Sequence, residues 1–240
     1  MSEQTTSLHS GPMSVLPSRQ RRQLADLGPL DQLRAGRLPR RVAQLLVGLV
    51  LYGLSMALIL RSTLGNMPWD VLHQGVAGRV PWSFGTVVVL SSVVVLLLWL
   101  PLRQKPGLGT VANALLIGIV VDSALRLVPG SDSLGGQVGL LVGGVGLNAV
   151  ATAMYIGSQL GPGARDGLMT GLARRTGWSL RLVRTLIEVA VVAVGWSLGG
   201  VLGLGTVLYA VAIGPLTQPL LPLFTVELPA LAVATTPDAL

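Results

Sequence analysis

Residues 61–79 have the sequence RSTLGNMPWDVLHQGVAGR, and a related stretch, GSQLGPGARDGLMTGLARR, occupies residues 157–175. The two stretches align without a gap at an offset of 96 residues. Over residues 48–118 against 144–214 the same alignment gives 26 identities in 71 positions. Leu and Val coincide by chance in apolar chains, but Asp, Arg and Trp in register do not. The chain therefore carries an internal duplication.

The composition excludes a water-soluble globule. Of the 240 residues, 51% are hydrophobic and 11% are charged, whereas about a quarter of a soluble chain is charged. The absence of Cys excludes a disulfide scaffold and any Cys-based metal or redox site. The net charge of +7 is not arranged as the basic stripe of a nucleic-acid-binding domain. We therefore expect a multi-pass protein that contacts the lipid bilayer and no nucleic acid.

Six apolar runs approach the length of about 20 residues that a membrane-spanning helix requires. They cover residues 42–60, 83–102, 108–127, 138–157, 180–198 and 203–223. The last two are separated only by a glycine-rich break at 199–205, so five spans with a re-entrant segment is the alternative. We expect a disordered, basic cytoplasmic tail at 1–40, membrane repeats at 41–129 and 138–224, and a short tail at 225–240.

The basic residues predict the orientation of these spans. With six spans, 14 of the 17 Lys and Arg residues lie on the side of the N-terminal tail, seven of them before the first apolar run. Only Arg61, Arg79 and Arg126 lie on the other side. The positive-inside rule then places the N-terminus, and with six spans the C-terminus, in the cytoplasm. For a bacterial chain, the membrane would be the inner one.

Three spans per repeat is an odd number, so the second copy is expected to be upside down relative to the first. Inverted repeats are common in secondary transporters, whose binding sites lie near the membrane midplane where the repeats meet. The expected fold is therefore an all-α polytopic membrane protein. It has about six transmembrane helices in two inverted three-helix repeats, with short broken or re-entrant helices.

The duplicated stretch itself predicts two short helices. Gly65, Asn66 and Pro68 break the first span, after which a new helix begins and places Asp70 in its first turn. Asp166 holds the same position in the second copy. In one interpretation the aspartates only cap short helices at the membrane surface. In the other, two half-helices enter the bundle from opposite sides and line a cavity for a proton, a cation or a polar neutral solute.

Other polar residues near the spans complete the set of candidates. Asp122 is expected to pair with Arg126, and Glu188 with Arg184, because each pair is four residues apart on a helix. His73 lies three residues after Asp70 and is placed to share its proton. The residues proposed to bind a solute or ion are Trp69, Asp70, His73, Asn113, Asn148, Arg165, Asp166 and Glu188.

Enzymatic motifs are absent from the sequence. It contains no His-Glu-x-x-His zinc helix, no Gly-x-Ser-x-Gly elbow and no phosphate-binding loop. We therefore expect no enzymatic activity, no metal and no cofactor. The expected function is transport of a small solute or ion. The alternative is a membrane regulator that does not transport and acts through protein contacts. The solute, and whether the partner is a second copy or another membrane protein, stay open.

Three runs resemble the bacterial YczE-like integral membrane proteins of the YczE/YyaS/YitT group. They are LVLYGLSMA at 49–57, PWDVLHQG at 68–75 and GPGARDGLMT at 161–170. The resemblance extends over about residues 38–224. It implies a bacterial cytoplasmic-membrane protein of a group with no agreed biochemical activity. It therefore supports the topology and leaves the function open.

Overall fold

The computed structural model describes residues 28–228, and these residues form helices and no β-strand. Five of the helices are long and apolar enough to cross a membrane: α2, α4, α5, α6 and α9. The helices are α1 (Pro29–Arg34), α2 (Leu38–Ser62), α3 (Pro68–Ala77), α4 (Phe84–Leu102), α5 (Leu108–Leu127), α6 (Leu134–Gly157), α7 (Ala164–Thr176), α8 (Leu180–Ser197) and α9 (Leu204–Phe224).

The helices begin where the sequence supplies a cap or a break. Ser83 and Ser179 precede α4 and α8, and each side chain accepts a hydrogen bond from the backbone of the first helical turn. Each of the six predicted runs contains a helix, and α5 has the predicted bounds. The fifth run forms α8, which carries three charged residues in its first nine positions and is not among the five candidate spans.

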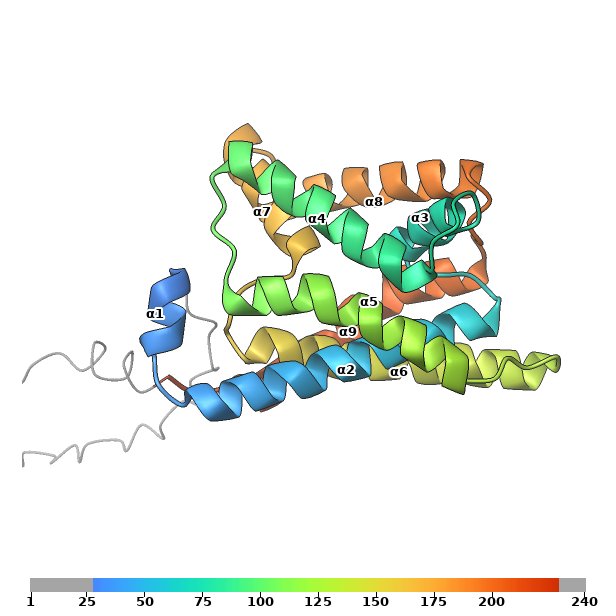
Figure 1. Ribbon diagram of the computed structural model, residues 1–240, viewed down its shortest axis with the longest axis horizontal. Coiled ribbons are helices and arrows are strands. Elements are labelled where there is room, and N and C mark those ends of the chain that lie inside the picture. Colours follow the sequence, from blue (N-terminus) through green and yellow to red (C-terminus); the bar gives the residue numbers. More distant parts are fainter. Residues whose placement is uncertain (1–27, 229–240) are drawn as a thin grey trace, which may run out of the picture.

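The long helices form two layers (Figure 1). Helices α2, α5, α6 and α9 lie side by side, and the most extensive contact in the molecule is between α2 and α6. Helices α4 and α8 lie on one side of this layer and form the second layer, together with the short helices α3 and α7 at opposite ends of it. Helix α3 packs against α8, and α7 packs against α4.

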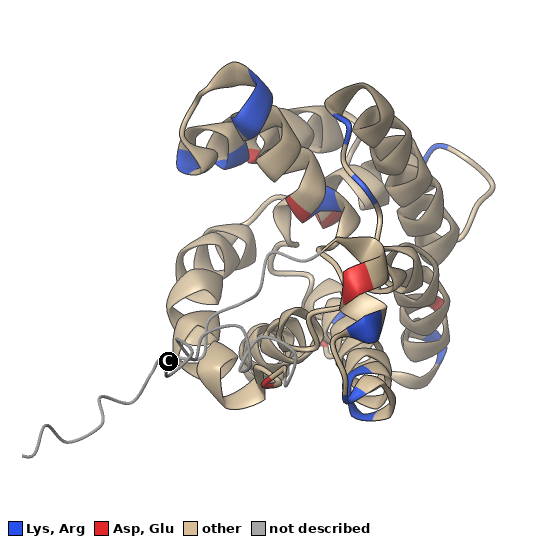
Figure 2. Ribbon diagram, turned by 90° about the vertical axis from the view of Figure 1, so that its left-hand side faces the viewer, with Lys and Arg blue, Asp and Glu red and all other residues tan. Residues whose placement is uncertain are grey.

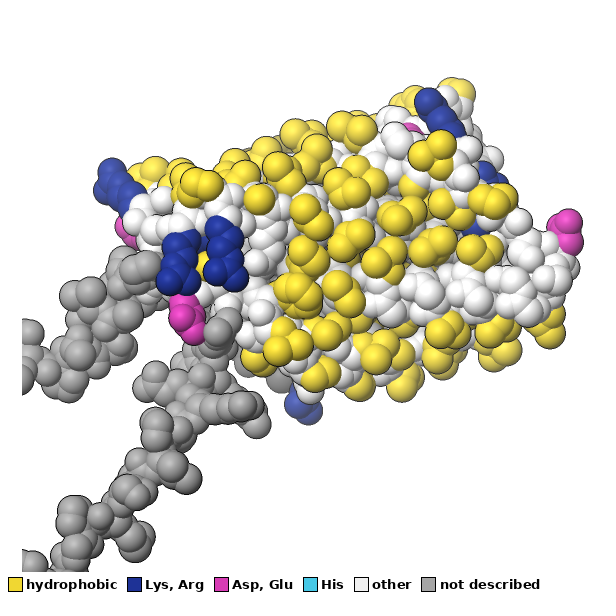
Figure 3. All heavy atoms as spheres, turned by 90° about the horizontal axis from the view of Figure 1, so that it is seen from below, with side chains coloured by type: hydrophobic (Ala, Val, Ile, Leu, Met, Phe, Trp, Pro, Cys, Tyr) yellow, Lys and Arg dark blue, Asp and Glu magenta, His cyan; other side chains and the backbone are white. Residues whose placement is uncertain are grey.

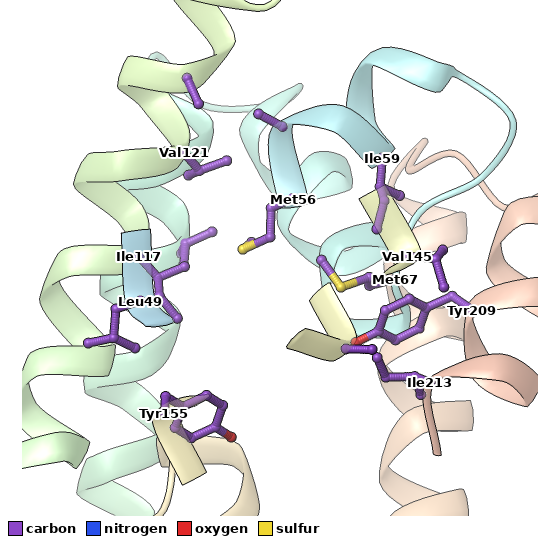
Figure 4. Close-up of a cluster of buried hydrophobic side chains, with 14 of the residues drawn as sticks. Leu49, Met56, Ile59, Met67, Ile117, Val121, Val145, Tyr155, Tyr209 and Ile213 are labelled. Carbon is purple, nitrogen blue, oxygen red and sulfur yellow. The ribbon is translucent and has the colours of Figure 1, made fainter. Parts of the chain in front are cut away.

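The apolar core lies between α2, α5, α6 and α9 (Figure 4). Leu49, Met56 and Ile59 of α2 are fully buried in it. A smaller cluster of Trp69, Val95, Trp99 and Ala164 joins α3, α4 and α7. There the indole Nε1 of Trp99 donates a hydrogen bond of 2.9 Å to the carbonyl of Ala164, at the first position of α7. This cluster thus contacts the first turns of both short helices.

The outer surface is suited to lipid. In the view of Figure 3, apolar side chains cover the middle of the molecule, and charged side chains gather towards its two ends. Large apolar side chains on α4, α5, α8 and α9 remain exposed, including Val94, Ile119, Trp196 and Val211. Such a band is typical of a multi-pass membrane protein.

The prediction that Asp122 pairs with Arg126 is wrong. Asp122 instead accepts hydrogen bonds from the backbone N–H of Gly85, at 2.7 Å, and from the hydroxyl of Ser83, at 2.5 Å. Both donors belong to the start of α4. The reason is a close crossing of α4 and α5, where the backbones of Gly85 and Gly118 meet and bring the carboxylate to the neighbouring helix.

Arg41 is fully buried, although its place in the chain had suggested only a topology signal. Its guanidinium donates hydrogen bonds to the carbonyls of Gln32, Ser158 and Gln159. It therefore connects the segment before α2 to the end of α6.

Within the predicted N-terminal tail the structure has helix α1, and residues 1–27 lie outside the described part. Of the predicted C-terminal tail, 225–228 are described and 229–240 are not.

Candidate functional site

The two short helices start inside the bundle. Gly65 and Gly161 precede them with φ angles of 127° and 118°, in the region that glycine adopts without a steric penalty. The carbonyl of Leu64 accepts a hydrogen bond of 2.9 Å from the backbone of Gly205 at the start of α9. These contacts anchor the chain just before α3. The chain before α7 is held in the same way, because Gly109 at the start of α5 bonds to the carbonyl of Leu160 at 2.7 Å.

A cavity of about 330 Å³ lies where the two short helices begin. It is bounded by the starts of α3 and α7 and by faces of α2, α5, α6, α8 and α9. All three tyrosines of the chain line it, and Figure 4 shows the hydroxyl ends of Tyr155 and Tyr209 directed into the space between their rings. Its polar and charged lining residues are Tyr52, Asn113, Thr152, Tyr155, Arg165, Asp166, Arg184, Glu188, Tyr209, Thr217 and Gln218.

Arg165 and Trp69 meet at this cavity. The guanidinium carbon lies 5.4 Å from the centre of the Trp69 ring, a cation–π distance. The two residues hold the same position in the two copies of the duplicated stretch, 96 residues apart. Figure 2 shows that acidic and basic positions occur in the middle of the ring of helices as well as on its outside. The site therefore places charge inside the bundle.

Asp166 is the one of the two duplicated aspartates that lines the cavity. It is exposed there, and its Oδ2 accepts a hydrogen bond of 2.7 Å from the hydroxyl of Tyr155 on α6. In the same lining, the Nε of Arg184 donates a hydrogen bond of 2.8 Å to Oε1 of Glu188. The predicted i, i+4 pair on α8 is confirmed.

Asp70 has different surroundings from Asp166. It is 1% exposed and does not line the cavity. Its Oδ1 lies 3.0 Å from Nδ1 of His73, and Nε2 of His73 lies 2.7 Å from the hydroxyl of Ser91 on α4. Oδ2 has no hydrogen-bond partner among the described residues. The distance agrees with the expectation that His73 is placed to share a proton with Asp70.

The structure thus separates the eight predicted site residues into two groups. Five line the cavity, and three do not. Of these three, Asn148 bonds to Ser55 of α2 and to Tyr209 of α9 and so joins helices. The five are Trp69, Asn113, Arg165, Asp166 and Glu188; the other three are Asp70, His73 and Asn148.

Tyr52 and Tyr209 were missed as cavity residues. The only indication in the sequence is that they are the polar aromatic residues of otherwise apolar runs. Within residues 28–228 no group of three or more His, Asp or Glu side chains is placed to hold a metal ion. The side chains that line the cavity offer hydrogen-bond donors and acceptors and charges of both signs.

Comparisons with known proteins identify relatives without an assigned activity. Residues 39–221 match the model of a family described as "Family of unknown function (DUF6198)". An uncharacterized protein of Haemophilus influenzae is 37% identical over 179 residues, which cover 75% of this chain and 82% of that protein.

Two proteins of Bacillus subtilis are also similar. The uncharacterized membrane protein YczE is 29% identical over 169 residues, covering 70% of this chain and 79% of that protein. The uncharacterized protein YyaS is 28% identical over 184 residues, covering 74% and 90%. No solved structure matches. Together with the five apolar helices, these relatives support a multi-pass membrane protein in contact with the lipid bilayer.

Proposed function

The chain belongs to the family of unknown function DUF6198, and we propose that it transports a small solute or ion. The cavity at the start of α3 and α7 is the proposed binding site. The observation that carries the proposal is the charge inside this cavity. Arg165 and Asp166 face it from the first turn of α7, at a break in the helical bundle. Charged groups at such depth are costly unless they serve a function, and transporters use them to bind substrates.

The proposal includes six spans in two inverted repeats. At an offset of 96, α2 and α3–α5 correspond to α6 and α7–α9. Figure 1 supports inversion, because α2 and α5 run from left to right and α6 and α9 run the opposite way. Helix α8 then serves as the sixth span. Arg184 and Glu188 do not argue against this role, because both line the cavity and pair with each other.

Exchanged contacts between the two copies give further support. Arg79, after α3, donates to the carbonyl of Ser197 at 3.2 Å, and Arg175, its counterpart at the end of α7, donates to the carbonyl of Pro101 at 2.5 Å. Pro101 and Ser197 are themselves 96 residues apart. Each copy thus donates to the other a hydrogen bond equivalent to the one that it accepts. This reciprocity is expected of two units related by a two-fold axis.

One pair of helices departs from this symmetry. Helix α4 packs along α5, but α8 and α9 make no comparably extensive contact. The cavity is lined by the first half of α8 and the second half of α9, where Gly214 and Gln218 are exposed. We therefore assign this structure to a state open between α8 and α9, at the end where α2 begins. By the positive-inside rule this end is cytoplasmic, and the membrane is the bacterial inner membrane.

The proposed function is testable without knowing the solute. Purified protein in lipid vesicles is incubated with a small-molecule extract of bacterial cells, and the vesicle contents are analysed by mass spectrometry. We expect at least one compound to enter these vesicles faster than it enters protein-free vesicles. Arg165→Gln should abolish the difference, and Arg103→Gln, on the exposed end of α4, should not.

Failure of this test has a clear meaning. If the folded protein admits no compound faster than empty vesicles do, the transport proposal is wrong. The alternative of a membrane regulator that acts through protein contacts would then be preferred. Melting curves of all variants establish that each compared protein is folded.

A further inference from the structure

The charges in the cavity are not equivalent. Four charged side chains line it, but Arg184 and Glu188 already neutralise each other at 2.8 Å. Arg165 and Asp166 remain. They follow each other in the first turn of α7, where side chains of consecutive residues point about 100° apart and do not face each other. A cation and an anion therefore line one wall of the cavity side by side without forming an ion pair.

Arg165 has unused hydrogen-bonding capacity. Among the described residues its guanidinium donates no hydrogen bond, and its contact with the Trp69 ring, at 5.4 Å from the ring centre, uses none of its N–H donors in a hydrogen bond. A guanidinium carries five N–H donors in a planar fork that matches a carboxylate. Trp69 and Arg165 line the cavity together. The group that satisfies this guanidinium best is the carboxylate of a ligand.

Asp166 has the opposite preference. The hydroxyl of Tyr155 occupies Oδ2, and this donor is neutral, so the negative charge of the carboxylate is not compensated by it. Oδ1 is left for a second donor. Since Asp166 is exposed and lines the cavity, that donor can come from a ligand, and an ammonium group would supply the hydrogen bond together with a charge of opposite sign.

From these two residues we infer that the ligand is a small zwitterion of the α-amino-acid type, with its carboxylate on Arg165 and its ammonium group on Asp166. The inference rests on the proposed function of this cavity. The rest of the wall fits such a molecule, because Met67, Ile117 and Ile213 provide an apolar surface for a side chain. A volume of about 330 Å³ lies at the lower end of the range for small-molecule sites.

The test compares three ligands that differ by one charged group. Leucine carries both groups, 3-methylbutylamine lacks the carboxylate, and 4-methylpentanoate lacks the ammonium. Binding to the purified protein in detergent is measured by calorimetry, after a thermal-shift survey of the twenty standard amino acids. If another amino acid stabilises the protein most, its own amine and acid replace the leucine pair. We expect the amino acid to bind at least about tenfold more tightly than either fragment, since each loses one charge-assisted hydrogen bond.

Two variants assign each charge to its residue. In Arg165→Gln the amino acid should bind no better than its amine, because the partner of the carboxylate is gone. In Asp166→Asn it should bind no better than its acid. Asp132→Asn, an exposed carboxylate outside the cavity, is the matched control and should keep the wild-type order of affinities.

Three outcomes would overturn the inference: no amino acid binds, a fragment binds as tightly as its parent, or both variants keep the wild-type preference. The first two concern the wild-type protein and do not depend on the folding of any variant. Binding in detergent is also separate from uptake into vesicles. If an amino acid binds the protein but does not enter the vesicles, the transport proposal is refuted and the zwitterion inference stands. If a solute without two opposite charges is transported, the zwitterion inference is refuted and the transport proposal stands.

Discussion

Replacing Gly118 by alanine tests how closely α4 and α5 are held together. A Cβ atom at this position would lie 2.4 Å from the carbonyl oxygen of Gly85 and 2.5 Å from a methyl carbon of Val89. Ordinary contacts begin at 3.4 Å, and the carbonyl belongs to a helical backbone that cannot rotate away. The two helices would therefore have to separate locally by about 1 Å, and overpacking of this kind costs about 1–3 kcal/mol.

Gly214 supplies the matched control, because it is the counterpart of Gly118 in the second copy. A Cβ atom there meets nothing within 4 Å. Both substitutions gain about 1 kcal/mol of helix propensity, so the difference between the variants isolates the packing cost. For a chain of this size each kcal/mol shifts the melting temperature by about 2–4 °C. Gly118→Ala should thus melt about 2–12 °C below Gly214→Ala.

The assay is thermal unfolding of both purified variants in the same detergent, followed by tryptophan fluorescence. Equal melting temperatures, or a Gly118→Ala protein more stable than Gly214→Ala, would refute the close contact of α4 with α5. Such a result would also remove the difference between the α4–α5 and α8–α9 pairs, on which the assignment of a state open between α8 and α9 depends.

Two further predictions address topology and stability. Trp82→Cys and Trp178→Cys stand 96 residues apart at sites that are 51 and 53% exposed, and in inverted repeats a membrane-impermeant maleimide should label them from opposite sides of the membrane. Labelling of both from one side would contradict inversion. Arg41→Gln should lower the free energy of unfolding by about 3 kcal/mol, because buried carbonyls lose charged donors. The exposed neighbour Arg40→Gln should change it by less than about 0.5 kcal/mol, and equal losses in thermal unfolding would disprove a structural role for Arg41.

The positions of the long helices could be predicted from the sequence to within a few residues, whereas α1 lies in a segment predicted to be disordered. Hydrophobic length, serine caps and glycine breaks are local properties, so α5 begins and ends where the sequence alone places it. The same reasoning located the start of α3 at Pro68, because proline is preorganised for the first turn of a helix. The length of the spans required nothing from other parts of the chain.

The partners of the charged residues could not be predicted in this way. Asp70 and Asp166 follow the same pattern, yet Asp70 meets a histidine three residues away and Asp166 meets Tyr155 from another helix. Asp122 likewise bonds to the start of α4 and not to the arginine on its own helix. Spacing along a helix identifies partners on that helix only. Contacts made across helices depend on crossing points that no local pattern contains.

The contact between Trp69 and Arg165 has a consequence for the origin of the site. If two identical copies of a single repeat assembled in this way, equivalent residues would face each other, and two guanidinium groups at about 5 Å would repel. Copies that have diverged in sequence, as these two have, can place an aromatic ring on one side and a cation on the other. Divergence thereby makes the interface between the copies asymmetric, and the proposed zwitterion would bind there in one orientation only.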